Sequence, residues 1–120
     1  MPAAIHADPQ AIARVLDRFP RLILVAAHFG GTDCWGDVLR HLVGKQVYLD
    51  TALSAGNIPA DTARQIIRAH GAHRILFGSD CPWHSSAMDA EFIRSLGLSE
   101  QEEEQIFYQN ACALLGREQI

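Results

Sequence analysis

Three stretches of the sequence place a polar residue directly after an apolar run. The run "RLILVAAH" ends in His28, "QVYLDT" ends in Asp50 and Thr51, and "RILFGSD" ends in Asp80. An acid at the end of a buried run is costly unless a positive charge or a hydrogen-bond donor lies beside it. Asp80 therefore either faces a cation, or caps the turn that follows it.

The neighbouring residues favour chemistry at two of these positions. The letters "FGG" follow His28, and paired glycines let a backbone approach a ligand closely. Without them, His28 could equally bond a loop carbonyl. Asp80 is entered through "GS" and followed by "CPW", which is a more specific setting than a plain loop cap. Asp50 could equally begin the next turn.

Other candidate residues lie close to these in the sequence. Trp83 and His84 follow Asp80, where Trp83 could form the wall of a pocket and His84 could contact a substrate. Trp35 is expected in the core, on a helix face. Cysteines near the strand ends lack an adjacent basic residue that would favour a thiolate. Surface roles are expected for the histidines in or beside helices, which are His41, His70 and His73.

Helices and strands alternate along the predicted chain. Asp8 before Pro9 is typical of a helix start, and Ser99 with Glu102 forms a capping box. Apolar residues at helical spacing predict that Val15, Phe19 and Leu115 face inward. Strands are expected over 21–28, 46–51 and 74–80, and helices over 9–19, 35–43, 59–71, 88–97 and from 100 onward.

The order of these elements predicts an α/β fold. The strands follow one another at close to the ~30-residue repeat of a βαβ unit. Their continuous apolarity predicts a parallel sheet with both faces covered. Because crossover helices connect parallel strands, the three carboxyl ends lie on one edge of the sheet, where α/β folds bind ligands. His28, Asp50 and Asp80 are expected there.

Composition narrows the class of protein. The 120 residues are 48% hydrophobic and 20% charged, which suits one globular domain over 1–120. A net charge of −4 and scattered basic residues argue against nucleic-acid binding. No apolar segment is long enough to cross a membrane. Three cysteines without a CxxC pair fit reduced thiols, so we expect a cytoplasmic protein.

Four motifs together resemble a known family. "HFGG", "VYLDT", "RILFGSDCPW" and "IFYQNACALLG" occur here in the order and spacing of the amidohydrolase-related family of metal-dependent hydrolases. This branch of the amidohydrolase superfamily includes the aminocarboxymuconate-semialdehyde decarboxylase type, and the resemblance runs from about Asp8 to Gly116. Its members are (β/α)8 TIM-type barrels with a divalent metal at the carboxyl ends of the strands.

The resemblance assigns roles to two residues. The three strands correspond to strands six, seven and eight of the family fold. His28 matches the strand-six histidine, a general acid/base or a metal ligand. Asp80 matches the strand-eight aspartate, which contacts the metal and helps take a proton from its bound water. The implied cofactor is a divalent ion, most simply zinc, and the implied substrate is a small carboxylate-bearing or cyclic molecule.

The resemblance covers only the C-terminal half of the family fold. The chain has no His-x-His pair, and His6 matches no family motif. His28 and Asp80 give at most two ligands, whereas catalytic zinc usually has three, so the isolated chain is expected to bind a divalent metal weakly or not at all. Two alternatives remain: an enzyme that is active once completed, or a non-catalytic, self-associating half-barrel or truncated remnant.

Three strands also predict association. A sheet of three strands has two open edges, so the chain is expected to form a homo-oligomer or to bind a missing N-terminal half. One face of such a sheet would lack packing partners. Because side chains alternate between the two faces, the residues without partners are either one set of side chains or the alternate set. The first of these sets is Leu22, Leu24, Val47, Leu49, Ile75 and Phe77.

Overall fold

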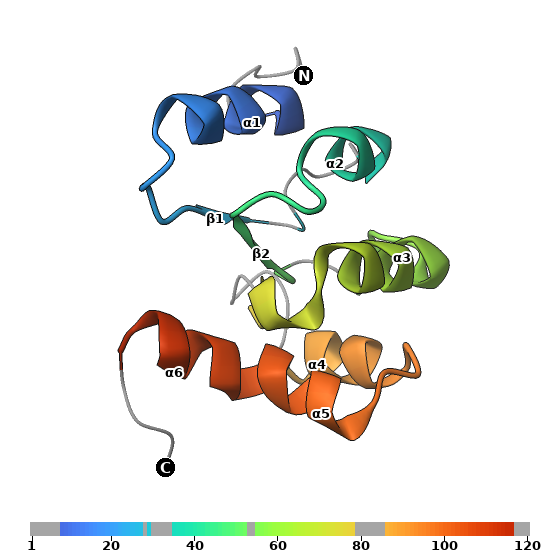
Figure 1. Ribbon diagram of the computed structural model, residues 1–120. Coiled ribbons are helices and arrows are strands. Elements are labelled where there is room, and N and C mark those ends of the chain that lie inside the picture. The colour runs from blue at the N-terminus through green and yellow to red at the C-terminus, as the bar shows by residue number, and fades with distance from the viewer. Residues whose placement is uncertain (1–7, 28, 30–34, 53–54, 79–85, 117–120) are drawn as a thin grey trace.

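Three short parallel strands alternate with helices in the computed structural model, which describes residues 8–27, 29, 35–52, 55–78 and 86–116 (Figure 1). This confirms the predicted α/β class. In order, the elements are α1 (Pro9–Arg18), β1 (Val25–Ala26), α2 (Trp35–His41), β2 (Tyr48–Asp50), α3 (Ala60–His70), the 3-10 turn η2 (Ala72–Arg74), β3 (Ile75–Leu76), α4 (Ser86–Arg94), α5 (Glu100–Glu104), the π-helical segment η3 (Gln105–Gln109) and α6 (Asn110–Leu114).

The predicted helix boundaries rest on local hydrogen bonds. The Asp8 carboxylate accepts from the Ala11 N–H at 2.7 Å and caps α1. The Ser99 hydroxyl accepts from the Glu102 N–H at 3.1 Å, while the Glu102 side chain accepts from the Ser99 N–H at 2.9 Å. Gly71 ends α3 with φ at 101°, a value that residues with a Cβ rarely adopt. These caps confirm the helix starts and stops read from the sequence.

The sheet has the order β1-β2-β3, and both strand pairs are parallel. Val25 lies opposite Tyr48, and Leu49 lies opposite Ile75. Each strand is shorter than its apolar run, because only part of each run pairs with a neighbour. The parallel order brings the carboxyl ends of the strands to one edge of the sheet, as the sequence predicts.

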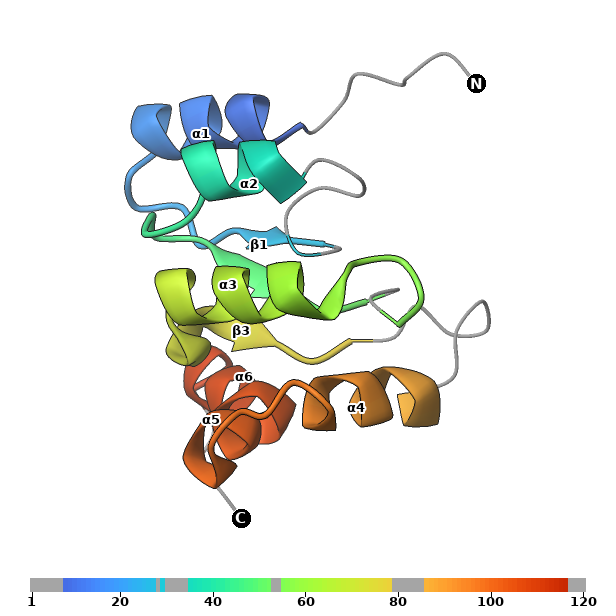
Figure 2. The ribbon, with the colours of Figure 1, turned by 90° about the vertical axis from the view of Figure 1, so that its right-hand side faces the viewer.

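Helices cover only one face of this sheet. Val47, Leu49 and Ile75 are fully buried and join the main core with residues of α2, α3 and α4. Their neighbours Ile23 and Val25 belong to the opposite face and are 68% and 43% exposed. In Figure 2, α3 passes in front of the strands, and α1 and α2 lie above β1. The continuous apolarity of the strands predicts that both faces are covered, and this is wrong for the described part of the chain. The open face expected of a three-stranded sheet is present, and it carries Ile23 and Val25.

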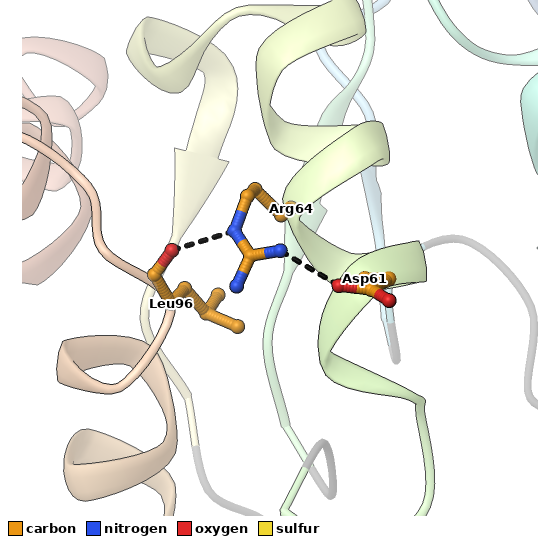
Figure 3. A network of polar contacts seen from close by, with 3 residues as sticks. All are labelled: Asp61, Arg64 and Leu96. Carbon is orange, nitrogen blue, oxygen red and sulfur yellow. Dashed lines mark hydrogen bonds and ion pairs between the residues drawn. The ribbon is translucent and has the colours of Figure 1, made fainter.

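A polar link joins α3 to the segment that follows α4. The Arg64 Nε donates to the Leu96 carbonyl at 2.7 Å, and its guanidinium also pairs with Asp61 at 2.8 Å (Figure 3). Asp61 is 96% exposed, so that ion pair adds little to stability. Leu96 is itself buried, so the bond from Arg64 ties α3 to the segment after α4.

Two residues of α1 and its end do not face inward as predicted. Val15 is 39% exposed and Phe19 is 54% exposed, whereas Ala13 and Leu16 of the same helix are buried. The apolar residues of this segment do recur at helical spacing, but the spacing does not show which of them pack against another element. In the described part of the chain, only one side of the apolar stripe of α1 is buried.

Leu115 is also exposed, at 69%, although the sequence predicts it in the core. The preceding segment η3 is π-helical, and a π-turn holds more residues than an α-turn. The residues after it are therefore rotated relative to a regular helix. In α6, the buried residue is Asn110 and not Leu115.

No helix in the described ranges is long and apolar enough to span a membrane.

Candidate functional site at the carboxyl ends of the strands

The end of β2 carries two polar residues with different surroundings. Thr51 is fully buried, and its N–H donates to the Leu76 carbonyl at 2.9 Å. Asp50 is half-buried, and one carboxylate oxygen accepts from the Ala52 N–H at 3.0 Å. That bond fixes the first turn after the strand, since an aspartate readily bonds the backbone two residues on. Asp50 therefore lies at this edge with a constrained side chain.

Thr51 joins β2 to the residue that follows β3. Its hydroxyl oxygen accepts from the Gly78 N–H at 3.1 Å and donates to the Gly78 carbonyl at 3.4 Å. A Cβ at Gly78 would lie 3.7 Å from the Asp50 Cγ and 3.6 Å from the Ala52 Cβ. Gly78 thus lies next to Asp50, two positions before Asp80 in the sequence.

The end of β1 contains an unusual backbone conformation. Phe29 is fully buried and has φ at 54°, in the left-handed region. A bulky residue with positive φ is a genuine outlier, and such strain costs about 1–3 kcal/mol. Strained residues concentrate at functional sites, and Phe29 directly follows His28. No residue pattern predicts this conformation at Phe29, because the two glycines that follow it are the expected site of a special backbone conformation.

A buried acid on α4 supports the loop after β2. Asp89 is fully buried, and its carboxylate accepts from the Ala55 N–H at 3.0 Å. This bond holds the loop near α4, on the same edge of the sheet as Asp50. Asp89 is not among the residues predicted from the sequence. An acid inside an otherwise apolar helical face was the signal that could have found it.

The predicted site residues His28, Asp80, Trp83 and His84 lie outside the described residues, as does His6. Their assignments stay predictions. Trp35 is half-buried and packs on the core, which confirms its expected structural role. Within the described ranges, no three His, Cys, Asp or Glu side chains are grouped so that they could hold a metal ion.

His70 is buried, so the prediction of a surface role for it is wrong. It is only 4% exposed; its Nδ1 accepts from the Gly44 N–H at 3.0 Å and its Nε2 donates to the Val47 carbonyl at 2.7 Å. Burial lowers the pKa of His70 below 6.5, and the nearby Arg74 and His73 lower it further. Gly44 and Val47 precede β2, so His70 stabilises the opposite end of the sheet.

Comparison with known proteins settles the family. The amidohydrolase family model matches residues 1–117. The chain belongs to the amidohydrolase family. This agrees with the parallel strands described above, whose carboxyl ends meet at one edge. A comparison with curated proteins found no match.

Solved structures show that this amidohydrolase chain has part of a TIM-barrel fold. A TIM-barrel protein of uncharacterised function from Bordetella bronchiseptica has a TM-score of 0.71 and 27% identity, covering 90% of this chain and 39% of its own. A candidate 2-pyrone-4,6-dicarboxylic acid hydrolase from Pseudomonas putida gives 0.69 and 24%, with coverages of 94% and 50%. A dihydroxybenzoic acid decarboxylase from Polaromonas, solved with manganese and 2-nitroresorcinol, gives 0.63 and 22%, with 92% and 39%.

The structural match covers nearly all of this chain but only part of each solved protein. The chain spans between about two fifths and one half of the lengths of these three proteins. Its three parallel strands with flanking helices therefore correspond to part of a barrel of eight strands.

Proposed function

We propose that this chain supplies the C-terminal part of the active site of a metal-dependent amidohydrolase. The completed enzyme would hydrolyse or decarboxylate a small carboxylate-bearing or cyclic substrate. The observation that carries the proposal is the bond between Thr51 and Gly78, which joins the ends of β2 and β3 beside Asp50. The sequence places Asp80 two residues later, at the edge where barrel enzymes keep their chemistry.

Two residues have proposed chemical roles. The Asp80 carboxylate accepts the proton of the attacking water, and His28 polarises the substrate or moves a proton between substrate and solvent. An imidazole suits this work because its ordinary pKa, near 6.5, lies close to neutral pH. The strained, buried Phe29 supports a functional role for the end of β1. Trp83 and His84 are proposed to contact the substrate.

The proposed cofactor is a divalent metal ion, with zinc as the first choice. Such an ion activates water and polarises a substrate oxygen. The Polaromonas decarboxylase, which holds manganese, supports a metal in this fold. The described residues alone do not form such a site, because no three of their His, Cys, Asp or Glu side chains are grouped together. His28 and Asp80, together with residues of the remaining strands, would have to supply the ligands.

The proposal is tested on a completed barrel. The chain would be combined with the part of the Bordetella protein that lies outside the match, with Zn²⁺ or Mn²⁺ present. Turnover of a dihydroxybenzoate and of 2-pyrone-4,6-dicarboxylate would be measured. Asp80→Asn is expected to abolish turnover, and His28→Ala to reduce it at least ~100-fold. Leu115→Ala, on the exposed end of α6, is the control and is expected to leave the rate unchanged.

Two results would contradict the proposal. An Asp80→Asn variant with the wild-type rate would remove Asp80 from the mechanism. A complex that forms but turns over neither substrate would favour the alternative, a non-catalytic half-barrel module that associates through its sheet. Formation of the complex is measured separately from turnover, so these results can be told apart.

A further inference from the structure

A hollow of about 410 Å³ lies at the amino ends of the three strands. It is lined by residues 20–24, which lead into β1, by Gln46 and Tyr48 around the start of β2, and by Arg74 directly before β3. Asp50 lies at the other end of β2. The hollow is therefore separate from the candidate active site, and in a barrel this end is the face opposite the chemistry.

Arg74 is held in place at the wall of this hollow. Its guanidinium Nη1 donates to the Lys45 carbonyl at 2.9 Å, and its backbone N–H donates to the Gly71 carbonyl at 3.1 Å. The residue is half-buried, and no described acid forms an ion pair with it. A guanidinium has five N–H donors, so the bond to Lys45 leaves donors for a ligand.

Arg21 is positioned by a turn on the other side of the hollow. The Leu22 N–H donates to the Phe19 carbonyl at 3.0 Å, which places Pro20 and Arg21 at the centre of the turn. Proline suits the first of these two positions because its φ is fixed. Arg21 is exposed and forms no ion pair with a described residue, so its charge is available to a ligand.

The hollow carries a positive charge. Of the described residues that line it, Arg21 and Arg74 are charged and none is acidic. Asp17 lines an adjoining hollow, where it pairs with Lys45 at 3.7 Å. The positive charge is felt at His70, whose pKa is lowered by burial and lowered further by Arg74. Two like charges that face one hollow repel each other, and an anion between them would relieve this repulsion.

The rest of the lining combines apolar and polar groups. Leu22, Leu24 and Tyr48 supply apolar surface, while Gln46 and Tyr48 carry side-chain groups that bond polar atoms. Tyr48 is fixed beside Leu24, because its N–H donates to the Leu24 carbonyl at 3.0 Å. The volume of the hollow is within the range of small-molecule sites.

We propose that this hollow binds an organic oxyanion, a small molecule with a carboxylate or phosphate group and an apolar body. Arg21 and Arg74 hold the anionic group, because guanidinium groups bind carboxylate and phosphate through paired hydrogen bonds. Leu22, Leu24 and Tyr48 contact the apolar body. The site uses only the three described strands and no metal, so it does not depend on the proposed function.

Binding is measured on the purified chain by titration calorimetry and by backbone amide shifts in NMR spectra, at constant ionic strength. The probes are phenyl phosphate, benzoate and inorganic phosphate. We expect saturable 1:1 binding of phenyl phosphate, with shifts at residues 21–24, 46–48 and 74. Inorganic phosphate lacks an apolar body and is expected to bind at least about tenfold more weakly. The stronger of phenyl phosphate and benzoate identifies the preferred anionic group.

Three arginine variants locate the site. Arg21→Gln removes a charge from an exposed turn and is expected to weaken phenyl phosphate binding at least about tenfold. Arg74→Gln is expected to weaken it likewise, and circular dichroism checks its folding because the bond to the Lys45 carbonyl is lost. Arg68→Gln is the control: it makes the same change of charge at an exposed position of α3 outside the hollow, and binding is expected to stay unchanged.

Three results would overturn the proposal. The first is a lack of saturable phenyl phosphate binding at millimolar concentration. The second is equal affinity in Arg21→Gln and Arg68→Gln, because binding would then respond only to the net charge. The third is a set of amide shifts confined to residues 50–52 and 78, which would place the anion at the candidate active site.

Discussion

The Thr51 hydroxyl and the Gly78 N–H lie 3.1 Å apart and tie the end of β2 to the end of β3. Thr51 is fully buried and Gly78 is half-buried, so this bond is partly shielded from water. It holds the backbone two residues before Asp80 next to Asp50. One side chain thereby connects the core of the sheet to the edge where the chemistry is proposed.

Replacing Thr51 by valine is expected to destabilise the protein by about 1–3 kcal/mol. The shape is nearly kept, but the half-buried Gly78 N–H loses its acceptor, and the buried site of the hydroxyl is filled by a methyl group. Urea unfolding followed by circular dichroism measures the free energy. Thr51→Ser keeps the hydroxyl and loses one methyl group, so it is expected to cost about 1 kcal/mol. A valine variant as stable as the wild type would show that the bond contributes nothing.

His70 is expected to make stability depend on pH. Burial holds the pKa of His70 below 6.5 in the folded protein, so the unfolded chain binds the proton more readily. The stability from neutral His70 is complete above pH 6.5 and is lost as the pH falls from there toward the folded pKa. Protonation would also set a proton on Nδ1 against the Gly44 N–H. Unfolding free energies at pH 7.5 and pH 5.5 measure the loss.

The His70 effect has two controls. His70→Gln cannot gain a proton in this range, so its loss of stability between the two pH values is expected to be smaller than that of the wild type. His41→Gln, on α2, is expected to keep the wild-type pH dependence. An equal loss of stability in His70→Gln and the wild type would assign the pH dependence to other groups.

Asn110 is expected to be among the most sensitive polar positions. Its side chain is 7% exposed and donates to the carbonyls of Ala72 and Ile75 at 2.6 and 2.8 Å. Asn110→Leu leaves both carbonyls without this donor, and a cost of about 2–3 kcal/mol is expected. Thermal and urea unfolding measure it. Among the described residues, the side chain of the neighbouring Gln109 bonds only Glu104, at 3.4 Å, so Gln109→Ala should change stability by less than about 0.5 kcal/mol. Equal effects would contradict the role given to Asn110.

The sequence determined the local structure and the family. Helix starts such as Asp8 and Ser99 depend on bonds within one turn, so residue type and spacing were sufficient. Parallel strands followed from apolar runs separated by helices, because such a connection imposes the strand direction. The motifs around His28, Asp50 and Asp80 indicated the amidohydrolase family, which the family model confirms.

Only the tertiary structure decided which surfaces are covered. The alternation that buries Leu49 and exposes Val25 depends on whether a second layer lies across the sheet, and a continuous apolar run does not record that. The burial of His70 depends on Gly44 and Val47, more than twenty residues away in the sequence. The cover of the outer edge of β3 depends on distant residues in the same way, because Ile106 of η3 and Asn110 of α6 bond to Phe77 and Ile75.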